Sequence, residues 1–151
     1  MRTIKFRGKD IETDEWLYGD LFQPLGRFPS IINTEPDING KVAYIQTSVK
    51  KDTVEQFTGL LDKNGKEIYE GDIVKNKEVG GYGLEYIGVV RYYKEDCRFG
   101  IDLTATNKFA KRCLFSVGEC SFNDGYCTIK YYNEYEVLGN IFDNPELLKS
   151  L

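Results

Sequence analysis

The chain has 151 residues, a formal net charge of −4, 14% aromatic residues and no histidine. A chain of this length forms one domain or two small lobes that share a core, burying roughly two thirds of its unfolded surface, and the aromatic content excludes disorder. Without histidine it lacks the commonest general base and metal ligand, and without a basic half its charge does not indicate general affinity for nucleic acid.

The N-terminus predicts a β-hairpin. Abundant Tyr, Phe and Gly favour strands joined by tight turns over helices. Residues 3–9 alternate basic with apolar side chains, which predicts a half-buried strand with a basic outer face. Residues 10–15 are a polar loop, and residues 16–22 form the returning strand. The basic side chains of the outer face are Lys5, Arg7 and Lys9.

A break and a second hairpin follow. Residues 23–29 contain two prolines and a glycine, which interrupt regular structure. Residues 30–33 and 41–46 are strand-like, and Asn39-Gly40 between them favours a hairpin turn. One helical turn is predicted after this hairpin, with Asp52 as its N-terminal cap.

The stretch from Gln56 to Val74 combines a tight turn, an acidic corner and the start of a strand. Asn64-Gly65 suits a two-residue type I′ turn, because both residues tolerate positive φ. That turn places Leu61 opposite Ile68 on one face of the hairpin and two acidic side chains on the other face. Because like charges repel, the second face is expected to be exposed to solvent. These acidic residues are Asp62 and Glu67. A reversal at Gly71 leads into a β-branched strand.

The next segments predict a small antiparallel barrel. Residues 76–84 form a glycine-rich loop, and residues 85–93 are the clearest long strand. Gly88 lies where a barrel strand would bend. Residues 98–103 follow after a turn as a short strand, which is the order expected of such a barrel.

The C-terminal third is less regular. Residues 104–112 are either a loop or one helical turn. A third hairpin is predicted from residues 113–122 and 125–132, which flank the turn sequence Asn123-Asp124-Gly125. Residues 135–142 are the closing strand. A short helix is predicted after it, with Asn144 as its cap and Pro145 at its first position.

Acidic residues and cysteines are the candidates for chemistry. The densest carboxylate cluster comprises Asp62, Glu67, Glu70 and Asp72. Acidic residues at a turn are usually solvated turn formers, and their spacing does not match a calcium-binding loop. The spacing of Cys97, Cys113, Cys120 and Cys127 does not favour a zinc site. Free thiols are expected. In one of the three possible registers of the third hairpin, Cys120 and Cys127 would face each other and could form a regulated disulfide, the alternative to a pair of half-buried thiols.

Tyrosines are more numerous than one small core easily buries. They are Tyr82, Tyr86, Tyr92, Tyr93, Tyr126, Tyr131, Tyr132 and Tyr135. Exposed tyrosines beside Arg91, Lys94 and Arg98 would stack on a peptide or on a single-stranded base. The alternative is that they pack in the core or between identical subunits.

The sequence predicts a cytoplasmic protein. The N-terminus alternates charged and apolar residues and lacks the apolar core of a signal peptide. No apolar run approaches the length of about 18 residues that spans a membrane.

Three blocks of the sequence resemble a known family. The central block is Gln56 to Val74, with the pattern Gln-Phe-Thr-Gly-Leu-x-Asp-Lys-Asn-Gly-Lys-Glu-Ile-Tyr-Glu-Gly-Asp-Ile-Val. The others are Ile4 to Lys9 followed by Glu15 to Asp20 near the start, and Tyr135 to Leu148 at the end. Together they resemble the YopX family, small proteins of bacteriophages and prophages. The resemblance implies a mainly β protein with an SH3-like barrel, no assigned activity and no catalytic residues to carry over.

The expected architecture is therefore all-β with minor helix. Residues 1–58 form an N-terminal β region, residues 59–143 an SH3-like barrel with an inserted hairpin, and residues 144–151 a short C-terminal helix. We expect a non-enzymatic protein-interaction module that binds no cofactor or metal, self-associates and contacts a phage or host protein. The alternatives are an accessory nucleic-acid-binding protein and a histidine-free, metal-dependent hydrolase.

Overall fold

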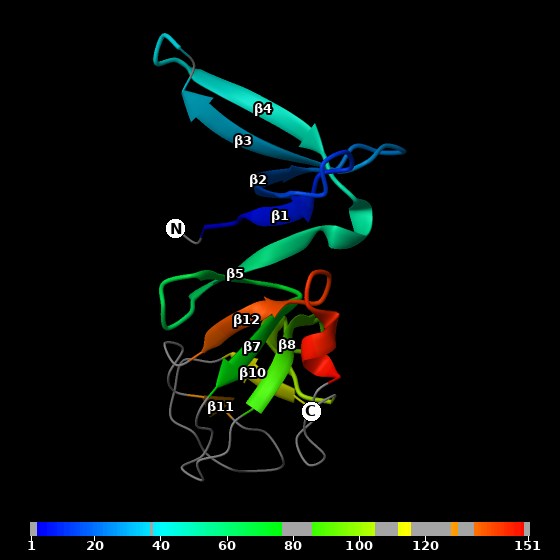
Figure 1. The fold of residues 1–151 in the computed structure, drawn as a ribbon, viewed down its shortest axis with the longest axis vertical. Coiled ribbons are helices and arrows are strands. Elements are labelled where there is room, and N and C mark those ends of the chain that lie inside the picture. The colour runs from blue at the N-terminus through cyan, green and yellow to red at the C-terminus, as the bar shows by residue number, and fades with distance from the viewer. Residues whose placement is uncertain are drawn as a thin grey trace. The chain divides into compact units, whose positions relative to one another are not determined.

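The computed structural model describes residues 3–36, 38–76, 86–104, 112–115, 128–129 and 135–149. These residues form a mainly β protein with two sheets and no α-helix (Figure 1). The chain divides into two compact units, Met1–Gly59 and Leu60–Leu151. No helix in the described ranges is long and apolar enough to cross a membrane.

The first hairpin is confirmed. Strands β1 (Phe6–Lys9) and β2 (Trp16–Phe22) pair antiparallel, with Phe6 opposite Gly19 and Lys9 opposite Trp16. The six-residue connection between them is tied at its base, where the Asp10 backbone N–H donates to the Glu15 carbonyl at 2.9 Å.

The second hairpin is also confirmed, and it is longer than predicted. Strands β3 (Ser30–Pro36) and β4 (Val42–Ser48) pair in one unbroken register from Ser30–Ser48 to Pro36–Val42. Strand β2 pairs with β3 only along residues 30–32. The far part of the hairpin, here called the arm, comprises residues 33–36 and 38–45, and in the described ranges its two strands pair with each other alone (Figure 1).

A single turn of 3-10 helix, η1 (Lys51–Thr53), leads into β5 (Glu55–Leu61), which pairs with β1. The predicted cap is wrong, because Lys50 occupies the N-cap position and no side chain caps the turn. The first sheet has the order β4-β3-β2-β1-β5-β6, with β6 at Glu67–Tyr69. Strand β5 itself runs from the first unit into the second.

The turn between β5 and β6 differs from the prediction. The Gly65 N–H donates to the Asp62 carbonyl at 3.0 Å, and the Asp62 N–H donates to the Lys66 carbonyl at 2.7 Å. Of the turn residues only Gly65 has positive φ, at 81°. The loop thus has three residues, as in a type I turn followed by a bulge at glycine. This one-residue change aligns Leu60, not Leu61, with Ile68, and Leu61 is 49% exposed.

The second sheet contains β7 (Asp72–Asn76), β8 (Tyr86–Tyr93), β9 (Arg98–Asp102), β10 (Arg112–Phe115), β11 (Thr128–Ile129) and β12 (Glu136–Asn140). Its order is β11-β10-β9-β8-β7-β12. Strands β12, β7, β8 and β9 are joined by antiparallel pairs, and β10 adds one more to β9. Strands β10 and β11 pair parallel, so the predicted third hairpin is wrong there. Its turn at residues 123–125 lies outside the described ranges.

The predicted barrel is confirmed only as an antiparallel sheet. In the described part of the chain, no strand pair closes the sheet between β11 and β12. The β5–β6 turn instead forms hydrogen bonds with the chain at β12. The Lys63 N–H donates to the Tyr135 carbonyl at 2.8 Å, and the Val137 N–H donates to Asp62 Oδ2 at 3.2 Å. The main hydrophobic cluster in the described part of this unit contains Ile68, Val74, Val90, Ile101, Leu103 and Tyr135.

The predicted C-terminal helix is a single 3-10 turn, η3 (Pro145–Leu148). Asn144 and Pro145 occupy the expected positions, but the Asn144 side chain does not cap the turn. Its Oδ1 atom instead accepts a hydrogen bond from the backbone N–H of Asn140 at 3.4 Å.

Candidate interaction surface

The acidic residues of the central motif do not converge on one point. Asp62 and Asp72 are only 5% and 1% exposed, which corrects the expectation that they are solvated. Asp72 accepts the Tyr69 N–H at 2.8 Å, Glu67 accepts the Tyr69 hydroxyl at 2.6 Å, and Glu70 accepts the Tyr92 N–H at 3.4 Å. Among the described residues, no group of three acidic or thiol side chains is placed to hold a metal ion.

Asp62 organises the β5–β6 turn. Its Oδ1 atom accepts the N–H groups of Asn64 at 2.7 Å and of Lys66 at 2.9 Å, and Oδ2 accepts that of Val137. Burial alone would raise the pKa of this carboxyl, but the backbone donors outweigh it and hold the pKa below its ordinary value of 3.8. Asp62 is thus a fixed anion in the fold.

The structure places few of the cysteines and tyrosines. Cys97 is an exposed free thiol, and the predicted pair Cys120 and Cys127 lies outside the described residues. Tyr92 is 43% exposed and packs edge-on against Phe99, with the ring centres 5.2 Å apart. Tyr135 is buried.

The other tyrosines add little to a surface in the described ranges. Tyr93 is half-buried under the guanidinium of Arg112, which lies 5.1 Å from the ring centre. The side chains of Tyr82, Tyr86, Tyr126, Tyr131 and Tyr132 lie outside the described part. Of the eight tyrosines predicted to form a surface, three have side chains that the structure describes, and of these three Tyr92 is exposed.

A cluster of cations and aromatic rings in the N-terminal unit was missed by sequence reasoning. The Arg7 guanidinium lies 4.6 Å from the Trp16 ring, Lys9 Nζ 5.5 Å from the same ring, and Lys5 Nζ 5.7 Å from Tyr18. The predicted six-residue loop of the first hairpin could have revealed this cluster, because a loop of that length puts Lys9 opposite Trp16 and Arg7 opposite Tyr18.

Arg7 corrects the predicted basic outer face. It is 4% exposed, and its guanidinium binds Glu55 Oε2 at 2.5 Å from Nη2 and 2.7 Å from Nε. Glu55 is itself 5% exposed, and it lies opposite Arg7 in the β1–β5 pair. The pair is therefore buried and joins two strands.

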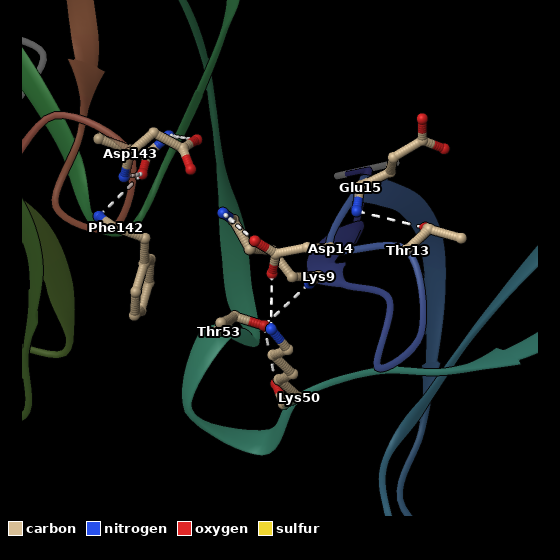
Figure 2. A network of polar contacts seen from close by, with 9 residues as sticks. Lys9, Thr13, Asp14, Glu15, Lys50, Thr53, Phe142 and Asp143 are labelled. Carbon is tan, nitrogen blue, oxygen red and sulfur yellow. Dashed lines mark hydrogen bonds and ion pairs between the residues drawn. The ribbon is translucent and has the colours of Figure 1, made fainter.

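Figure 2 shows how the hairpin loop is held to η1. Asp14 accepts Lys50 Nζ at 2.6 Å and Lys9 Nζ at 3.4 Å, and these lysines lower the pKa of its carboxyl. Thr53 Oγ1 accepts the Lys9 N–H at 2.8 Å and donates to the Lys50 carbonyl at 2.7 Å. Four cations of this unit, Lys5, Arg7, Lys9 and Lys50, thus have partners within it.

The second group in Figure 2 belongs to the turn after β12. The backbone N–H groups of Phe142 and Asp143 both donate to Asn140 Oδ1 at 2.9 Å, and Asn140 Nδ2 donates to Asp143 Oδ2 at 2.7 Å. These bonds fix the chain between β12 and η3. The side-chain oxygen and nitrogen of Asn140 thus both take part in hydrogen bonds that stabilise this turn.

Apolar side chains are distributed unequally between the two units. Of the thirteen buried core hydrophobic residues in the described ranges, only three belong to the N-terminal unit. Of the thirteen large hydrophobic residues that are exposed in the same ranges, ten belong to it. The ten are Ile4, Ile11, Tyr18, Phe22, Leu25, Phe28, Ile38, Val42, Tyr44 and Ile45.

Two parts of the N-terminal unit carry most of this exposed apolar surface. The connection between β2 and β3, here called the 23–29 loop, has Leu25 fully exposed and Phe28 62% exposed. Hollows of about 610 and 530 Å³ adjoin the loop, and Lys51 lines the larger one. The arm is the second part.

Comparison with protein families matches the family described as YopX protein to residues 5–149. Among solved structures the chain is similar to protein EF1440 from Enterococcus faecalis, known from a crystal structure. The two are 25% identical over 98% of this chain and 99% of that chain, with a TM-score of 0.54. A search of curated proteins finds no match. Because the family match extends over nearly the whole sequence, this chain belongs to the YopX family.

Proposed function

We propose that this YopX family protein is non-enzymatic and acts by binding another protein, of phage or host origin, through its N-terminal unit. One observation carries the proposal: of the thirteen large hydrophobic residues that are exposed in the described ranges, ten belong to that unit. Concentrated exposed apolar side chains mark protein interaction sites, because water is a poor solvent for them.

The 23–29 loop is the proposed contact with that partner. Leu25 and Phe28 project from a segment that also contains Pro24 and Pro29, and proline limits the backbone freedom that binding would remove. A rigid apolar anchor entering a partner pocket contributes more to affinity than its share of the contact area.

Protein binding is favoured over binding of nucleic acid because several cations of the N-terminal unit are buried or paired with carboxylates. A nucleic-acid surface presents several cations to phosphate groups. In the N-terminal unit Arg7 is buried against Glu55, and Lys9 and Lys50 contact Asp14. Of the acidic side chains that a hydrolase would use, Asp62 and Asp72 accept backbone N–H groups and Glu67 accepts the Tyr69 hydroxyl.

Affinity capture followed by titration tests the proposal. The purified chain is used to capture proteins from the bacterium that carries its gene, and a captured protein is purified and titrated by calorimetry. The variant Leu25→Ser/Phe28→Ser should weaken its binding about ten-fold or more, since loss of one anchor commonly costs more than 1.4 kcal/mol. Leu138→Ser, at a 37% exposed site on β12, should bind like the wild type.

Two results would contradict the proposal. One is a captured protein whose affinity is unchanged by the loop variant. The other is salt-sensitive retardation of single-stranded DNA, or metal-dependent hydrolysis, by a preparation that binds no protein. Circular dichroism of each variant shows that the loss of binding does not come from unfolding.

A further inference from the structure

We infer that the 23–29 loop and its hollows bind a peptide segment of the partner in which an acidic side chain lies beside an apolar one. The inference rests on the proposed function, because it names the chemistry of the partner that the loop would contact. It is carried by two cations at the hollows, by the conformation of the loop and by the neutral polar groups around it.

The larger hollow has two cations in its lining. Arg27 and Lys51 are both exposed there, beside the apolar side chains of Leu25 and Phe28. None of the described residues that line either hollow is acidic, although the whole chain has more acidic than basic residues. Asp52 follows Lys51 in the sequence but lines neither hollow. The charge at the hollows is therefore opposite in sign to the net charge of the chain.

The fold does not use these two cations. Lys9 and Lys50 contact the carboxylate of Asp14 within the same unit. In the described ranges, Arg27 and Lys51 form neither an ion pair nor a side-chain hydrogen bond. A carboxylate of the partner would thus meet cations that no group of this unit neutralises, and charge complementarity of this kind gives an interface its specificity.

The loop begins with a tight turn that fixes two of these side chains. The Arg27 N–H donates to the Pro24 carbonyl at 3.5 Å, and Gly26 has a φ of 71°, as the third residue of a type II turn requires. Leu25 is the corner residue of this turn. Because the turn orders the backbone before binding, Leu25 and Arg27 can contact a partner with less loss of conformational entropy.

The chain after β4 brings Lys51 to the loop. The Val49 N–H donates to the Pro29 carbonyl at 2.9 Å, and the Val49 side chain is fully buried. Lys51 follows two residues later, at the start of η1. Two segments that are separate in the sequence therefore border one hollow and supply one cation each.

A peptide suits these hollows better than a nucleic acid or a membrane. Affinity for nucleic acid is built from many phosphate contacts, and attachment to an anionic membrane needs a cluster of basic residues. Two cations match one or two carboxylates instead. The other polar lining includes Gln23, Gln46 and Ser48, whose amide and hydroxyl groups can both donate to and accept from a peptide backbone.

Selection from a displayed library of random peptides tests the inference with a defined probe. Peptides are selected on the immobilised wild-type chain, after removal of those that bind Leu25→Ser/Phe28→Ser. The selected peptides should carry an aspartate or glutamate close to a leucine, isoleucine or aromatic residue, more often than the unselected library does. Absence of acidic enrichment, or of any selected peptide, would overturn the inference.

Charge reversal locates the acidic contact. A selected peptide that carries a fluorophore should bind Arg27→Glu/Lys51→Glu about ten-fold or more weakly than the wild type, because two attractions become repulsions. The same peptide with its acidic residues changed to lysine should bind this variant more tightly than it binds the wild type. Arg91→Glu/Lys94→Glu is the matched control in the other unit, since both sites are exposed and the net charge changes equally. It should bind the original peptide like the wild type.

The outcomes separate this inference from the proposed function. Equal weakening by the two reversal variants would overturn the inference, and so would tighter binding of single-stranded DNA or of phosphatidylglycerol vesicles than of any selected peptide. Selected peptides that need Leu25 and Phe28 but carry no acidic residue would overturn it while the loop remains a protein contact. Circular dichroism of each variant shows whether it is folded.

Discussion

Asp62 shows how one carboxylate can define a turn. Its two oxygens accept three backbone N–H groups, two from the turn and one from Val137 on β12. Hydrogen bonds to a charged acceptor are stronger than those between neutral groups. The acidic side chain that looked like a candidate for chemistry is thus a structural acceptor whose donors come from the backbone.

Asp62→Asn should destabilise the protein by about 1–3 kcal/mol, because an amide keeps one acceptor oxygen and turns its NH₂ toward another donor. Urea denaturation at neutral pH measures the change. Asp52→Asn is the control, since Asp52 is exposed in η1, and its effect should stay within about 0.5 kcal/mol. Equal stability of the two variants would show that the turn does not depend on the carboxylate.

The pH dependence follows from the same contacts. The folded state lowers the pKa of Asp62 below 3.8, so the stabilisation is complete above the unfolded value. It is lost as the pH falls through the folded pKa. The difference in stability between the wild type and Asp62→Asn should therefore narrow below about pH 4, and a constant difference would contradict this account.

At the scale of elements, the Arg7–Glu55 pair joins β1 to β5. Both residues are nearly inaccessible, and the Trp16 ring lies against the guanidinium. A buried pair gains little over an apolar pair, but removal of one partner leaves a buried charge. The strand pairing of this unit, which has few buried apolar side chains, therefore depends on both members.

Arg7→Met should destabilise the N-terminal unit by about 3–5 kcal/mol, and Arg7→Met/Glu55→Leu should recover much of that loss. Thermal unfolding followed by Trp16 fluorescence, the signal of the single tryptophan, measures both. Lys50→Met is the control, because its partner Asp14 is exposed and the ion pair is screened by water. A double variant no more stable than Arg7→Met would contradict the account.

At the scale of the whole molecule, the two units differ in how much apolar surface they bury. Among the residues that the structure describes, the C-terminal unit holds ten of the thirteen buried core hydrophobic residues, and the N-terminal unit holds most of the exposed ones. Burial of apolar surface is the main favourable term in folding. The unit that supplies the proposed contacts is thus also the one with the thinner core.

Hydrogen exchange should reveal this difference. Backbone amides of β7, β8 and β9 should exchange at least about ten-fold more slowly than those of β2, β3 and β4, because opening the C-terminal unit exposes more apolar surface. Mass spectrometry of peptides after exchange at low protein concentration measures both sets without self-association. Uniform protection would show that the two units open together.

Local patterns in the sequence identified many of the elements. Alternation and loop length predicted the β1–β2 hairpin, Asn39-Gly40 the β3–β4 hairpin, and Pro145 the start of η3. These features depend on residues near each other in the chain. The β5–β6 turn was missed by one residue because Asn-Gly suits both a two-residue and a three-residue loop. In the three-residue loop Asp62 accepts the N–H groups of Asn64 and Lys66, and also that of the distant Val137.

By itself the sequence determined that this is a strand-rich YopX family chain without histidine, because composition, periodicity and motif order are local properties. Tertiary structure decided which side chains are buried and which remain exposed. Arg7 looked like a surface cation until Glu55, forty-eight residues away, was placed beside it. The arm looked like any other hairpin until β2 was found to pair with only part of it, because the exposure of a strand depends on its neighbours in space.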